Sequence, residues 1–215
     1  MSHAPADLTA LAFDEMVREG FPPDFDSSVF AELETVQSLQ TIPVDADVED
    51  LRSFLWSSID NQSSRDLDQI EFCETTSAGI RLLVGIADVS SNVPIDSAID
   101  RHAAGEATSV YALVRTFPML PEKLSAGLTS LNEGEDRLAV MIEMLIAPDG
   151  VVLSHRAFRA LVCNRAQLAY ETVGPWLEGK SEPPPKVASS VELQAQLRLQ
   201  DSTSRALRRR RQQMG

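Results

Sequence analysis

Three aspartates lie close together in the sequence, at positions 60, 66 and 68. Asp66 and Asp68 are two residues apart, so in an extended chain both carboxylates point to one side and Leu67 to the other. Asp60 precedes a polar loop that can fold back beside them. Carboxylates that converge repel one another unless a cation or a proton neutralises them, and hard oxygen ligands favour Mg²⁺ or Mn²⁺. Two such ions can activate a water molecule and stabilise both oxygens of an in-line phosphodiester displacement.

A solvated acidic loop is the alternative interpretation of the same residues. The intervening residues Asn61, Gln62, Ser63 and Ser64 are common turn formers. The spacing alone therefore favours an ordinary loop over a metal site, and the metal hypothesis needs support from the rest of the chain.

The charge distribution bears on nucleic-acid binding. The 215 residues carry a net charge of -13, which opposes a generally basic RNA-binding face. Five arginines, at 205 and 208–211, stand near the end of the chain, and we interpret them as the solvated basic end of a helix rather than as phosphate ligands. An acidic chain can still bind RNA locally through metal ions, which invert the local charge.

Other site classes have little support. The histidines are scattered, and the two cysteines lie far apart in apolar stretches, as is typical of buried free thiols. There is no apolar run of transmembrane length and no secretory signal pattern at the first residues, so we expect no membrane contact and a cytoplasmic location.

The periodicity of apolar residues predicts an α+β fold, with a mixed or antiparallel sheet and packed helices. Pro148-Asp149-Gly150 is a turn signal between two apolar strands and predicts a hairpin. A strand–loop–strand unit is expected over 57–74, and residues 45–50 are expected to be a loop or a helix start. Further strands are expected at 80–87, 109–120, 137–147 and 151–162, helices at 8–18, 27–39, 97–107, 122–131, 165–177 and 190–214, and a stiff linker at 181–186.

The aspartate segment resembles the motif of the ribonuclease II family, in which a first aspartate is followed six, eight and nine residues later by three more. Asp60, Asp66 and Asp68 match the first three positions, and Gln69 departs from the fourth. The resemblance continues in register over roughly residues 50–214. It rests on the segments 84–90, 97–101, 108–111, 117–121, 124–131, 136–138 and 168–171.

The resemblance implies a metal-dependent 3′→5′ exoribonuclease that hydrolyses single-stranded RNA to nucleoside 5′-monophosphates. Asp60 and the fourth position, here Gln69, would hold Mg²⁺ (or Mn²⁺) with the scissile phosphate. Asp66 and Asp68 would hold or support a second ion. Tyr111 matches an aromatic residue that stacks on the RNA near its 3′ end, and from the sequence alone it could equally be a core residue with a solvated hydroxyl.

Two departures from the family pattern lead to further expectations. Gln69 offers a neutral oxygen where a carboxylate is expected, and Glu71, two residues on, is a candidate to replace it. The resemblance covers only the N-terminal part of the catalytic domain, so we expect a helical extension at 1–49 and a partial catalytic domain at 50–215. Such a half domain would expose apolar surface for the missing C-terminal half or for a homodimer. The alternative function is a catalytically inactive RNA- or protein-binding module of the same fold.

Overall fold

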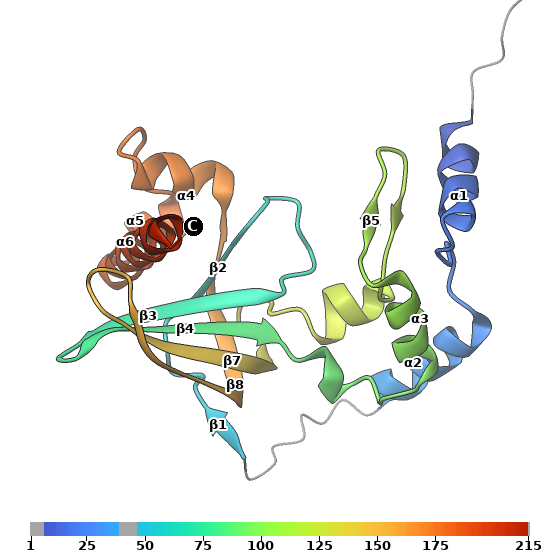
Figure 1. Ribbon diagram of the computed structural model, residues 1–215, viewed down its shortest axis with the longest axis horizontal. Coiled ribbons are helices and arrows are strands. Elements are labelled where there is room, and N and C mark those ends of the chain that lie inside the picture. Colours follow the sequence, from blue (N-terminus) through green and yellow to red (C-terminus); the bar gives the residue numbers. More distant parts are fainter. Residues whose placement is uncertain (1–6, 39–46, 215) are drawn as a thin grey trace, which may run out of the picture. The chain divides into compact units, whose positions relative to one another are not determined.

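The computed structural model describes residues 7–38 and 47–214 of the chain, which divide into two compact units (Figure 1). The helical unit contains the described part of Met1–Thr41 together with Val89–Leu128. The sheet unit contains the described part of Ile42–Asp88 together with Thr129–Gly215. Both units are discontinuous in the sequence, and the predicted division near residue 50 stays a prediction.

In the helical unit, the second helix shares one core with the segment that follows Asp88. Val29 and Leu33 of the second helix pack with Ile99 and Leu124. The carboxylate of Glu32 accepts hydrogen bonds from the backbone N–H groups of Ala98 at 2.6 Å and Ile99 at 3.2 Å, which caps the third helix. The elements are α1 (Leu8–Arg18), α2 (Ser27–Ser38), η1 (Val89–Ser91), α3 (Ala98–Glu106), β5 (Val110–Tyr111), β6 (Thr116–Phe117) and the π-helix η2 (Lys123–Leu128).

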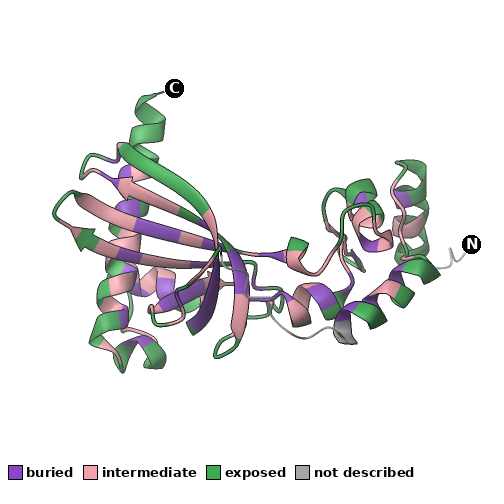
Figure 2. Cartoon of the chain, turned by 90° about the horizontal axis from the view of Figure 1, so that it is seen from below, coloured by how far each residue is buried: buried purple, intermediate pink, exposed green. Residues whose placement is uncertain are grey.

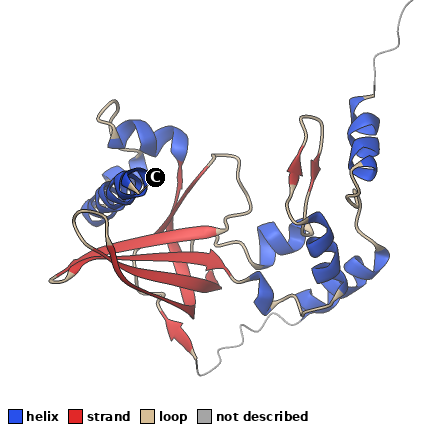
Figure 3. Ribbon diagram, viewed as in Figure 1, coloured by secondary structure: helices blue, strands red, loops and turns tan. Residues whose placement is uncertain are grey.

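The sheet unit is built on six strands in the order β1-β8-β2-β3-β4-β7. Strand β8 pairs antiparallel with β7 along its first part and parallel with β2 along its last part, so the sheet closes on itself. The strands are β1 (Val48–Asp50), β2 (Trp56–Asp60), β3 (Gln69–Thr76), β4 (Gly79–Ala87), β7 (Asp136–Ile146) and β8 (Val152–Ala169). The helices are α4 (Tyr170–Leu177), α5 (Pro185–Ala188) and α6 (Val191–Gln213). Figure 3 shows the strands in red and the helices in blue.

The two faces of this sheet carry different cores. Trp56, Leu83, Met141 and Val162 form the core of one face, which we call the inner face. On the other, outer face, Leu207 of α6 packs against Cys73, Leu82 and Ile146. Strand residues alternate between the two faces, and Figure 2 shows the buried positions as purple bands along the strands.

The structure confirms the α+β fold and most predicted elements, including the hairpin and the last helix. The predicted helix at 165–177 is wrong in its first part, because β8 continues to Ala169 and the helix begins at Tyr170. Residues 48–50 form a strand rather than a loop or helix start, and 45–46 lie outside the described residues, as does residue 39 of the predicted second helix. The predicted linker at 181–186 ends in a short helix that begins at Pro185.

The extended segment predicted at 109–120 is a short hairpin of two strands. Cys73 and Cys163 are buried free thiols, as predicted. Within the part of the chain that the structure describes, none of the helices has the length and apolar character that crossing a bilayer requires. The cytoplasmic location stays a prediction.

Candidate functional site

Asp60 is the last residue of β2 and organises the loop that follows it. Its Oδ1 atom accepts hydrogen bonds from the backbone N–H of Asn61 at 2.8 Å and from the hydroxyl of Ser64 at 2.7 Å. The backbone N–H of Ser64 also donates to the carbonyl of Asn61 at 3.0 Å. The turn-forming residues of the sequence therefore fold the loop back over the first aspartate, as an Asx-type turn does.

Leu67 anchors the other end of this loop in the core. It is 1% exposed, and its backbone N–H donates to the hydroxyl of Ser130 at 3.0 Å. The neighbouring residues Asp66 and Asp68 are exposed. This burial pattern follows the alternation expected from the sequence, because an apolar side chain that is buried in an extended segment turns both of its neighbours toward solvent.

The negative charges of Asp60 and Asp66 both act on Asp68. Partial burial raises the pKa of Asp68, a hydrogen bond from its own backbone N–H lowers it, and the negative charges of Asp60 and Asp66 raise it further. Asp68, just before β3, thus lies within electrostatic reach of Asp60 at the end of β2 and of Asp66 in the loop between the two strands. Such a group is stabilised by a cation.

The carboxylates of the three aspartates do not converge on one position. Among residues 7–38 and 47–214, no three His, Cys, Asp or Glu side chains come together in a way that would hold a metal ion. The chemistry of the donors nevertheless fits Mg²⁺ or Mn²⁺, because the aspartates supply hard carboxylate oxygens and Gln69 adds an amide oxygen.

Gln69 and Glu71 take different places on β3. Gln69 is exposed at the first position of the strand, beside Asp68. Glu71 points toward α6, where burial raises its pKa to about 7. No charge of the three aspartates contributes to that shift, and no described residue forms a hydrogen bond or an ion pair with the Glu71 carboxyl group. These observations do not place Glu71 with the aspartates, and its role as a replacement ligand stays a hypothesis.

Tyr170 is a site residue to which the sequence analysis gave no role. It begins α4, directly after β8. Burial raises the pKa of its hydroxyl, and the negative charges of Asp60, Glu71 and Asp68 raise that pKa further. Tyr170 therefore lies within electrostatic reach of Asp60, Asp68 and Glu71. The signal in the sequence was its place in the segment 168–171, which resembles a family segment.

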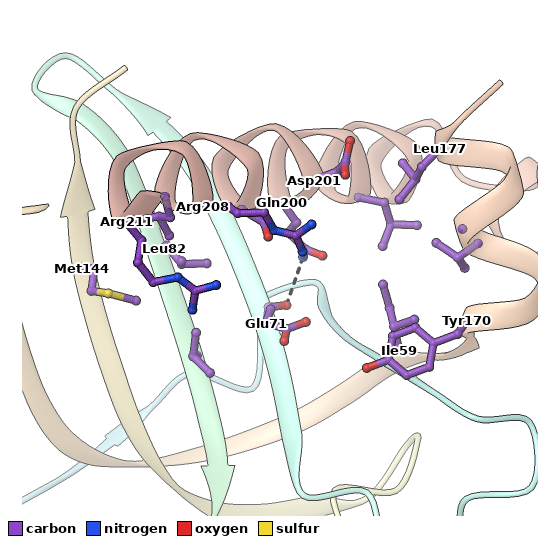
Figure 4. Close-up of a pocket in the computed structure, with 16 residues that line it drawn as sticks. Ile59, Glu71, Leu82, Met144, Tyr170, Leu177, Gln200, Asp201, Arg208 and Arg211 are labelled. Atoms are coloured by element: carbon purple, nitrogen blue, oxygen red, sulfur yellow. Dashed lines mark hydrogen bonds between the residues drawn. The ribbon is translucent and has the colours of Figure 1, made fainter. Parts of the chain in front are cut away.

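A hollow of about 660 Å³ adjoins these residues on the outer face of the sheet. Figure 4 shows α6 crossing the strands, with Glu71, Tyr170 and Arg211 beside the hollow. The side-chain amide of Gln200 donates to the backbone carbonyl of Glu71 at 3.3 Å. The remaining lining is largely aliphatic, from Ile59, Leu82, Val84, Met144, Val173 and Leu177.

Tyr111 lies in the helical unit, on the hairpin formed by β5 and β6. It pairs with Thr116, and 72% of the residue is exposed. The exposure excludes the interpretation of Tyr111 as a core residue. Its phenol ring is available to stack on a planar group, and the stacking role stays a prediction.

Comparisons with known proteins agree with the resemblance seen in the motifs. The family described as "RNB domain" matches residues 48–215. Ribonuclease R of Vibrio parahaemolyticus is 43% identical over 134 residues, which are 62% of this chain and 16% of that protein. Ribonuclease R of Acidithiobacillus ferrooxidans is 36% identical over 194 residues, which are 89% of this chain and 44% of that protein.

The fold is also similar to a solved structure. RNase R of Mycoplasma genitalium, in complex with ribose-methylated single-stranded RNA, superposes with a TM-score of 0.82 at 26% sequence identity. The match covers 97% of this chain and 32% of the M. genitalium chain. This chain thus spans less than half the length of each of these three relatives.

Proposed function

Since the chain belongs to the RNB-domain family, we propose that it is a metal-dependent 3′→5′ exoribonuclease domain that hydrolyses single-stranded RNA to nucleoside 5′-monophosphates. The observation that carries this proposal is that the charges of Asp60 and Asp66, which stand at the spacing of the family motif, act on Asp68 and repel its carboxylate. A divalent cation relieves that repulsion and supplies the charge that an RNA phosphate needs.

The proposed ion is Mg²⁺, with Mn²⁺ as a substitute, and its chemistry is the activation of water and the neutralisation of charge on the phosphate. Asp60 and Gln69 hold the ion beside the scissile phosphate in this proposal, and Asp66 and Asp68 hold or support a second ion. Ser64 and the Asn61 backbone orient Asp60 through its Oδ1 atom, which leaves Oδ2 for the ion. Tyr111 stacks on a base near the 3′ end of the RNA.

The test is whether the purified chain shortens poly(A) from its 3′ end in the presence of Mg²⁺ or Mn²⁺. We expect release of adenosine 5′-monophosphate that stops on chelation with EDTA and is abolished by Asp68→Asn. Asp14→Asn is the matched control, since Asp14 is an exposed residue of α1. Absence of metal-dependent shortening in the wild-type chain would refute the enzymatic proposal for this chain.

A second candidate function is a catalytically inactive RNA- or protein-binding module. The observation that favours it is Gln69, which removes one negative charge from an already open group of ligands. The two functions differ in one measurement. The module binds 5′-fluorescein-labelled oligo(A) without shortening it, whereas the enzyme shortens it in the presence of the metal.

We further propose that the chain works with additional polypeptide, either the C-terminal half of an RNB catalytic domain or a second copy. The support is the coverage of the relatives, of which this chain spans 16–44%. The measurement is the rate of RNA shortening with and without a separately expressed C-terminal half taken from ribonuclease R of A. ferrooxidans. If the rate of RNA shortening is the same with and without that half, and the chain stays monomeric, the proposal of an additional polypeptide is contradicted.

A further inference from the structure

Helix α6 covers only part of the outer face of the sheet. It contacts β3, and Leu207 packs against Leu82 and its neighbours. On the same face, Ile86 of β4 is 42% exposed, and Val140 and Ile142 of β7 are each 37% exposed. Apolar residues are thus left in solvent beside a helix that buries their neighbours.

The strand register shows that these residues form one continuous surface. Val84 pairs with Ile142, Ile86 pairs with Val140, and Ile142 pairs with Ala157 of β8. Directly paired residues point to the same face. We call this surface the outer strip and define it by Val84, Ile86, Val140, Ile142, Met144 and Ala157.

The outer strip continues into the hollow beside α6. Val84 and Met144 belong to both, and the hollow extends from them to Tyr170 and Leu177. In Figure 4 the labelled Met144 and Leu82 lie on the strands crossed by α6, and Tyr170 lies on the far side of Glu71. Strip and hollow together make a trough along one side of α6.

Two cations line this trough without a partner. Arg208 and Arg211 form no ion pair with any described residue, although both line the hollow. By contrast, Arg205 pairs with Asp201 at 2.9 Å, and Arg198 lies over the ring of Trp176. Two guanidinium groups that no described residue pairs, on one side of a helix, present the donor geometry that suits the carboxylates of a partner.

Gln200 adds a polar residue to the wall of the hollow. The Gln200 side chain donates through Nε2 to Ser57 and to the Glu71 carbonyl, but its Oε1 is buried and has no hydrogen-bond partner among the described residues. The trough therefore combines apolar contact with defined polar positions.

We propose that this trough binds an amphipathic, acidic α-helix of a partner polypeptide, which lies alongside α6. Its apolar side chains contact the outer strip, and carboxylates one turn apart contact Arg208 and Arg211. The dimensions suit a helix, because packed helices lie ~8–10 Å apart and two adjacent strand spacings amount to about 10 Å. The proposal refines the partner in the proposed function and does not depend on the metal chemistry.

The probe is a fluorescein-labelled designed peptide of about five helical turns (~18 residues), with leucines along one face and glutamates one turn apart at its edge. Binding is measured by fluorescence anisotropy in EDTA, so that loss of the metal site has no influence. We expect saturable binding that Ile142→Glu weakens by at least about tenfold, because the change buries an unpaired charge. Val191→Glu, at an exposed apolar residue at the start of α6, is the matched control and leaves binding unchanged.

A charge exchange tests the position of the helix. The double variant Arg208→Glu/Arg211→Glu should no longer bind the glutamate peptide and should bind the corresponding lysine peptide instead. The control is Arg209→Glu/Arg210→Glu, on the same exposed end of α6. Its preference between the glutamate and lysine peptides should change much less. Circular dichroism confirms that each variant is folded, and all substituted side chains are at least one third exposed.

Three outcomes would overturn the proposal. Equal binding of the peptide to the wild type and to Ile142→Glu would place the peptide elsewhere. A concentration-dependent dimer that Ile142→Glu dissociates in sedimentation would assign the trough to a second copy. Binding of decanoate without binding of the peptide would assign the hollow to a small anionic amphiphile. RNA shortening is measured separately, and its absence refutes the enzymatic proposal without touching this one.

Discussion

The hydroxyl of Ser64 donates a hydrogen bond to Oδ1 of Asp60 at 2.7 Å, and this contact joins the first aspartate to the loop that leads to the second and third. The contact spans four residues and is partly buried. Its effect is to orient one carboxylate oxygen toward the loop, and in the proposed metal site the other oxygen would bind the cation.

Removing this hydrogen bond should loosen the loop. We expect Ser64→Ala to lower the free energy of unfolding by about 1.5–3 kcal/mol, because hydrogen bonds to charged groups contribute about that much. The same variant should bind Mn²⁺ more weakly. Thermal unfolding and calorimetric titration measure the two effects. Ser63→Ala, at the exposed neighbour, is the control, and equal effects of both variants would show that the contact has no specific role.

Restoring the fourth carboxylate should strengthen metal binding. Gln69 stands beside Asp68 at the start of β3, so Gln69→Asp adds a charged oxygen ligand to the group. We expect the Mn²⁺ dissociation constant to fall by about tenfold, which corresponds to about 1.4 kcal/mol. Gln212→Asp adds the same charge at the exposed end of α6 and should have no effect. If the affinity of Gln69→Asp stays at the wild-type value, position 69 lies outside the metal site.

The stability of the protein should fall as the pH rises from about 4.5 to about 7. Burial raises the pKa of Glu71 from an ordinary 4.5 to about 7 in the folded state. Between those values the folded state binds more protons than the unfolded state, so the free energy of unfolding decreases with pH and levels off above about 7. The expected contribution is up to about 3 kcal/mol.

Urea unfolding across this pH range in EDTA measures that dependence. Glu71→Gln should flatten the curve, because the amide does not ionise. Glu182→Gln, at an exposed residue, should keep the wild-type pH dependence. A curve for Glu71→Gln that matches the wild type would show that another group is responsible.

The cysteine thiols should be inert in the folded protein. Burial raises the pKa of Cys73 to about 12, although a hydrogen bond with Thr203 lowers it in part, and Cys163 is buried as well. Since the thiolate is the reactive form, we expect Ellman's reagent at pH 8 to react with neither thiol of the native protein. Both should react after unfolding in guanidinium chloride. Fast reaction of one thiol in the folded state would contradict the burial of that residue.

Local patterns in the sequence predicted several features well. The hairpin at 137–162 follows from the alternation of apolar residues on either side of Pro148-Asp149-Gly150. The alternation and the turn are both local features, because each depends on residues that are near neighbours in the sequence. The alternation of Asp66, Leu67 and Asp68 likewise predicted which side chain would be buried. The helical prediction for residues 165–169 was wrong because parallel pairing with β2, over a hundred residues earlier, overrides local helix propensity.

For the candidate site, the sequence by itself determined the identity and spacing of the carboxylates, and the order of segments that resemble the family. The tertiary structure decided which groups share an environment. The charges of Asp60, Asp68 and Glu71 all act on Tyr170 because β8 runs beside β2 before α4 begins. Glu71 faces an apolar hollow because α6, more than a hundred residues later, crosses β3 at that point. The sequence period places a side chain on one face of a strand, but only the packing of distant elements decides whether that face meets water, a charge or a helix.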